Sequence, residues 1–84
     1  MEKREAISRV GTVLSTTFSP PESAPMYAVR LETGEGVLSV KWLGRREVPG
    51  VGLGSKLEVK GIPVRNEDTL DLINPDYQLL KASA

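Results

Sequence analysis

Hydrophobic and polar residues alternate along two neighbouring segments in the middle of the chain, residues 26–32 and 37–43. A period of two is typical of a strand with one buried face. The residues that share the apolar face of these segments are Tyr27, Val29, Leu31, Leu38, Val40 and Trp42. A glycine-bearing turn at residues 33–36 separates the two segments, so the pattern predicts a β-hairpin.

Three further strands are predicted on either side of this hairpin. Residues 7–17 are rich in β-branched side chains and contain Gly11, which indicates a bulge or a sharp bend in a long first strand. Residues 55–64 and residues 69–73 again follow the pattern of half-buried strands. The residues that we expect the first strand to contribute to the core are Val10, Val13 and Leu14.

Segments rich in glycine and proline separate these strands. Residues 18–25 contain three prolines, and residues 44–54 contain four glycines and a proline, so both are expected to be loops. The apolar residues of the second loop that we expect beneath the sheet are Val48, Val51 and Leu53. The pair Asn74-Pro75 ends the last strand, and residues 76–84 are expected to form a tail that docks on the domain.

Five strands with turns at short, regular spacing, and without a convincing helix, predict an all-β domain. A long bent strand, a hairpin, an irregular crossing and a second hairpin are the order of a small five-stranded OB-fold barrel. An SH3-like barrel is the alternative. The chain of 84 residues is long enough for one domain with a single core. Residues 1–6 and 81–84 are expected to be frayed ends.

The composition argues against catalysis and against bound metals. The chain has no cysteine and no histidine, which removes thiolate ligands, the commonest metal ligand and the commonest general base. No pair of carboxylates stands out as an acid and base. We therefore expect a protein that is not an enzyme and that needs no cofactor.

The balance of charge limits the strength of any contact with nucleic acid. Eleven basic and eleven acidic residues give a net charge of zero, whereas dedicated nucleic-acid binders usually carry a basic excess. No apolar run reaches the roughly 18 residues of a membrane span, and no apolar segment follows the charged N-terminus. We expect a cytoplasmic protein without a membrane partner.

Candidate binding residues gather around the strand at residues 37–43. Arg30 and Lys41 point outward by the alternation, and Arg45 and Arg46 follow the strand end directly. An aromatic side chain beside cations can stack a base and hold a phosphate, which makes Trp42 a candidate as well. The alternation places Trp42 inward, although a bulge near Gly44 would reverse its direction. Both interpretations of Trp42 remain open at this point.

Motifs in the second half of the chain resemble a known family. In order, these are Leu43-Gly44-Arg45-Arg46, Val48-Pro49-Gly50, Gly54, Val59-Lys60-Gly61 and Asn74-Pro75-Asp76-Tyr77. The chain resembles the small stand-alone OB-fold nucleic-acid-binding proteins of actinobacteria, and more distantly the wedge OB domain of RecG-type helicases. The resemblance covers roughly Arg9 to Leu80. It implies an OB barrel and single-stranded or branched nucleic acid as ligand.

Two hypotheses of function follow. The first is a module that binds single-stranded DNA or RNA with modest affinity through Arg30, Lys41, Trp42, Arg45 and Arg46. The second is a protein-interaction module, such as a homodimer, that uses the exposed apolar positions Val37 and Leu43 or an open sheet edge. The zero net charge favours the second hypothesis.

Overall fold

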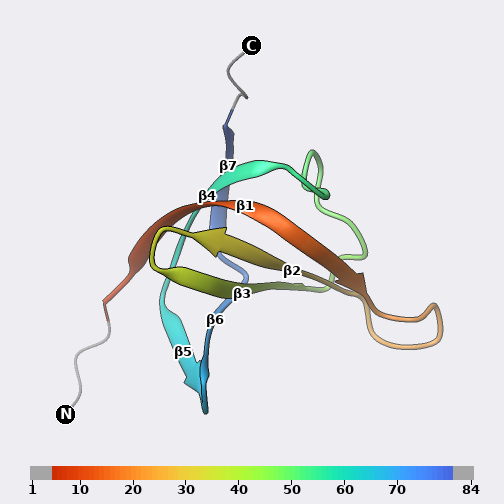
Figure 1. The fold of residues 1–84 in the computed structure, drawn as a ribbon. Helices are drawn as coiled ribbons and strands as arrows, with labels where there is room; N and C mark the ends of the chain where they lie inside the picture. The colour runs from red at the N-terminus through yellow and green to blue at the C-terminus, as the bar shows by residue number, and fades with distance from the viewer. Residues whose placement is uncertain (1–4, 81–84) are drawn as a thin grey trace.

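The computed structural model describes residues 5–80, which form seven β-strands and no helix (Figure 1). The strands are β1 (Ile7–Phe18), β2 (Met26–Thr33), β3 (Gly36–Leu43), β4 (Lys56–Gly61), β5 (Pro63–Asn66), β6 (Thr69–Ile73) and β7 (Asp76–Leu80). All seven belong to one mixed sheet. The prediction of an all-β domain is therefore confirmed for the described part of the chain.

The sheet has the order β5-β6-β3-β2-β1-β4-β7. Neighbouring strands are antiparallel except β3 and β6, which are parallel. The order is open, so the expectation of five strands closed into a barrel is wrong in strand number and in closure. The two additional strands arise because the expected strand 55–64 is interrupted beside Pro63, which has no backbone N–H to donate, and because the expected tail forms β7.

The two ends of the sheet belong to one interrupted hairpin. Only Ile62 separates β4 from β5, and only Asn74-Pro75 separates β6 from β7. Next to the turn at residues 67–68, β5 pairs with β6. Further from that turn, β4 pairs with β7. In Figure 1, β5 and β6 extend to one side of the long, curved β1 and β7 extends to the other.

The expected C-terminal tail is instead largely a strand. Residues 76–80 form β7, where Tyr77 is opposite Val59 of β4. The expected docking is confirmed, since Tyr77 packs against the core, but the strand was missed because its partner lies about twenty positions earlier in the chain, which a local pattern does not reveal. The predicted frayed ends at residues 1–4 and 81–84 lie outside the described residues.

The core follows the predicted alternation in the central strands. The side chains with least exposure are Leu31, Leu57, Leu72, Val29, Val40 and Val59. They come from four strands, β2, β3, β4 and β6, whose inner faces therefore share a single core.

Strand β1 departs from the prediction at two positions. Val13 is buried, but Val10 and Leu14 are exposed. The register with β2 shifts between Val13 and Ser15, so Leu14 is the extra residue of a β-bulge. Gly11 lies where β1 crosses close to β2, because a Cβ there would overlap the carbonyl oxygen of Glu32.

The glycine-rich segment between β3 and β4 covers one end of the core. Val48 and Val51 are buried as predicted, whereas Leu53 is exposed, contrary to the prediction. The hydroxyl of Tyr27 donates to the carbonyl of Val51 at 2.9 Å, and the hydroxyl of Tyr77 donates to the carbonyl of Pro49 at 3.3 Å. These bonds fix a segment without regular structure against the sheet.

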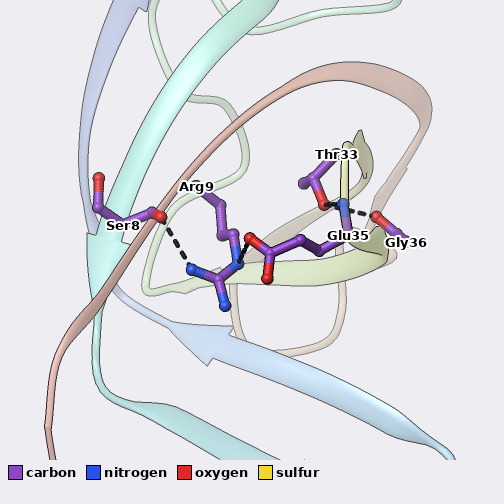
Figure 2. A network of polar contacts seen from close by, with 5 residues as sticks. All are labelled: Ser8, Arg9, Thr33, Glu35 and Gly36. Atoms are coloured by element: carbon purple, nitrogen blue, oxygen red, sulfur yellow. Dashed lines mark hydrogen bonds and ion pairs between the residues drawn. The ribbon is translucent and has the colours of Figure 1, made fainter.

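A polar network joins the β2–β3 turn to β1 (Figure 2). The hydroxyl of Thr33 donates to the carbonyl of Gly36 at 2.7 Å and accepts from the amide of Glu35 at 3.1 Å. The Glu35 carboxylate then forms an ion pair with the Arg9 Nε at 3.3 Å. Arg9 is thus engaged in the fold, and the turn is tied to the neighbouring strand.

Candidate functional site

The outer face of β2 and β3 carries an open hollow of about 420 Å³ beside the β5–β6 turn. It is lined by Arg30, Val37, Ser39, Lys41, Asn66, Thr69 and Asp71. Arg30 of β2 is opposite Ser39 of β3, and Ser39 is next to Asp71 of β6. The strands therefore bring together Arg30 and Lys41, two of the residues predicted to bind.

A buried carboxylate lies beneath the cations of this hollow. Asp71 is 3% exposed although it faces outward. It accepts a hydrogen bond from the Asn66 amide at 2.7 Å and pairs with the Lys41 ammonium at 3.6 Å. Lys41 is therefore partly neutralised, which reduces the attraction of the site for phosphate.

This role of Asp71 was not predicted from the sequence. The signal was present, since Asp71 interrupts the apolar run of the last predicted strand between Leu70 and Leu72. A charged residue so placed is on the opposite face from the core. Its partner Lys41 is thirty positions earlier, and the parallel pairing of β3 with β6 brings the two together.

Arg30 and Arg45 are the most available cations of the predicted set. Both are exposed, and neither forms an ion pair with another residue between positions 5 and 80. Arg45 follows the end of β3, where Gly44 adopts a positive φ of 86° and turns the chain. Such cations are free to meet a phosphate without breaking an existing contact.

Arg46 has a different role from its neighbour. Its guanidinium donates to the carbonyl of Pro21 and to the carbonyl of Ser23, both at 2.9 Å. Arg46 thereby holds the proline-rich loop between β1 and β2 against the end of β3. The two adjacent arginines therefore differ in role: Arg46 anchors a loop, and Arg45 faces solvent.

Trp42 lies in the core and is 4% exposed. Its ring is stacked with that of Tyr27, with ring centroids 6.4 Å apart, and forms a T-shaped pair with that of Tyr77, with centroids 5.5 Å apart. The indole N–H donates to the carbonyl of Pro75 at 3.3 Å. The structure follows the inward direction given by the alternation and leaves little of the ring free to stack a base.

A second open hollow, of about 500 Å³, lies where β3 ends and β6 gives way to β7. It is lined by Trp42, Leu43, Arg45, Asn74, Pro75, Asp76 and Tyr77. Asn74 shapes it with a left-handed φ of 52°. The side-chain oxygen of Asn74 accepts a hydrogen bond from the backbone N–H of Leu43 at 2.7 Å. The backbone N–H of Asn74 donates to the carbonyl of Lys41, also at 2.7 Å. This hollow was not predicted from the sequence, although the Asn-Pro-Asp-Tyr motif marks its position.

Within residues 5–80, no group of acidic side chains is arranged to hold a metal ion. The same residues include no helix that is long and apolar enough to cross a membrane. Comparison with models of known protein families and with curated proteins finds no match to this chain.

Proposed function

We propose that this protein is a non-enzymatic module that binds single-stranded nucleic acid with modest affinity along the outer face of β2 and β3. The observation that carries the proposal is the placement of Arg30, Lys41 and Arg45. These cations line two hollows, one on the outer face of β2 and β3 and one at the end of β3. Arg30 and Arg45 have no ion-pair partner in the described part of the chain.

The strand connections support an OB-type scaffold for this module. Strands β1, β2 and β3 form a meander, β4 returns to pair with β1, and β6 pairs in parallel with β3. In OB-folds, ligand lies across the second and third strands, between the first loop and the loop of the last hairpin. The proline-rich loop held by Arg46 and the turn at residues 67–68 occupy these two places. The resemblance to actinobacterial OB-fold proteins agrees with this proposal.

The expected affinity is modest for two reasons. The net charge of the chain is zero, and Asp71 offsets part of the charge of Lys41. Binding through three cations to a single strand gives a slope of log K against log salt of about −2, since each contact contributes about −0.7.

Titration of a fluorescent mixed-sequence DNA strand of about 12 nucleotides tests the proposal. We expect binding at about 50 mM salt that weakens at about 200 mM, with the slope given above. Arg30→Ala and Arg45→Ala should each weaken binding and lower the slope by about 0.7. Lys56→Ala is the matched control, because it removes an exposed cation from β4, and it should leave binding unchanged. Absence of binding at the lower salt would refute the proposal.

A second candidate function is protein interaction through this same face or through an open edge. Val37 and Leu43 are 45% and 52% exposed on the outer face of β3, and β5 and β7 end the order of the sheet. A homodimer that uses the β3 face would cover Arg30 and Lys41. Light scattering after size exclusion distinguishes the two functions: a stable dimer that excludes the DNA strand favours this candidate, and a monomer that binds the strand favours the first.

A further inference from the structure

The hollow at the end of β3 is lined by two side chains of opposite charge that do not form an ion pair with each other. Arg45 and Asp76 both line it and both are exposed. Neither forms an ion pair with the other or with any residue from 5 to 80. A ligand that carries an anionic group and a hydrogen-bond donor would therefore find a partner for each.

Three other side chains of the hollow each form a hydrogen bond within the fold. The Trp42 indole donates to Pro75, the Tyr77 hydroxyl donates to Pro49, and the Asn74 side-chain oxygen accepts from Leu43. These contacts hold the walls in place, and Arg45 and Asp76 are the charged groups of the lining without an ion pair among residues 5–80. Specificity in small-ligand sites comes from a few placed polar groups of this kind.

The apolar surface of the hollow suits a planar ring. Leu43 is half exposed, and Pro75 and Tyr77 complete the lining. Its volume of about 500 Å³ lies within the range of small-molecule sites. Lys41 of the first hollow and Leu43 of this one lie two positions apart on the outer face of β3, so the two hollows are neighbours along that face. A single strand of nucleic acid bound at Arg30 and Lys41 can therefore extend into the hollow at the end of β3.

We infer, on the basis of the proposed function, that this hollow is a subsite for one nucleotide whose base carries an exocyclic amino group. Arg45 binds the phosphate, and the Asp76 carboxylate accepts a hydrogen bond from the amino group. Carboxylates pair in this way with the amino group of cytosine. Thymine and uracil have a carbonyl oxygen at that position, which a carboxylate repels. The protein therefore prefers cytosine, adenine or guanine over thymine or uracil at this subsite.

The test compares oligo(dC) with oligo(dT), each of about 12 nucleotides, at low salt. We expect the unmodified protein to bind oligo(dC) about five- to tenfold more tightly, as one charge-assisted hydrogen bond allows. Asp76→Asn should bring the ratio close to one, because an amide both donates and accepts. Asp68→Asn is the matched control: it removes the same charge from the β5–β6 turn and should keep the ratio.

The outcomes separate this inference from the proposed function. Equal binding of both strands by the unmodified protein overturns the base subsite and leaves nucleic-acid binding in place. A preference for oligo(dC) that survives in Asp76→Asn overturns the assignment to Asp76. Absence of binding to either strand overturns the proposed function and the subsite together.

Discussion

The absence of a Cβ atom at Gly11 allows β1 and β2 to approach closely. A Cβ at this position would overlap the Glu32 carbonyl oxygen and lie 2.8 Å from the Leu31 Cγ. We expect Gly11→Ala to destabilise the fold by about 1–3 kcal/mol, as overpacking of a close contact does. Chemical denaturation measures the change in the free energy of unfolding.

Gly52→Ala provides the control for this prediction. A Cβ at Gly52 meets no atom within 4 Å. Its cost should remain within about 0.5 kcal/mol, as for ordinary surface changes. Equal costs for the two substitutions would show that β1 and β2 can move apart at Gly11.

Asn74 combines a left-handed backbone with a hydrogen bond to Leu43. Asn74→Ala loses the bond and places a Cβ in an unfavourable conformation, so we expect a loss of about 2–3 kcal/mol. Asn74→Gly loses the bond but tolerates the backbone, so its loss should be about 1 kcal/mol. Thermal or chemical unfolding of both variants gives the comparison, and a larger loss in Asn74→Gly would contradict the role of the backbone.

At the scale of elements, the proline-rich loop between β1 and β2 depends on Arg46. The two carbonyls that Arg46 binds belong to Pro21 and Ser23. We expect Arg46→Ala to increase amide hydrogen exchange in the loop while β2 and β3 keep their protection. Arg45→Ala is the control, since Arg45 has no such contact, and similar exchange in the two variants would rule out the anchoring role.

The affinity of the hollow on the outer face of β2 and β3 for phosphate depends on the charge of Asp71. Asp71→Asn removes that charge while its side chain still accepts from Asn66, so Lys41 becomes free to bind phosphate. If the proposed function is right, the DNA strand should bind about two- to fivefold more tightly, because the attraction of Lys41 for phosphate is no longer offset. Fluorescence titration at two salt concentrations checks this, and unchanged affinity would mean that Lys41 does not contact the strand.

The same scale shows what the sequence could predict and what it could not. Alternation predicted β2, β3 and the inward direction of Trp42, because each depends on residues two positions apart, although the binding hypothesis had also included Trp42. It missed the exposure of Leu14, because the bulge that shifts the phase lies there and not at Gly11, where the sequence had indicated a bulge or bend. It also missed the pairing of Lys41 with Asp71 and the bonds of Arg46, because their partners lie more than twenty positions away in the chain.

At the scale of the whole molecule, the hairpin from β4 to β7 holds the sheet at both ends. Its β4 half pairs with β1, and its β6 segment pairs with β3. This arrangement also governs the molecule during its synthesis. A nascent chain that ends before Thr69 has made β1, β2 and β3 but leaves the edge of β3 without the partner it has in the finished sheet. Open strand edges invite pairing with other chains, so the nascent chain is exposed to aggregation until β6 emerges.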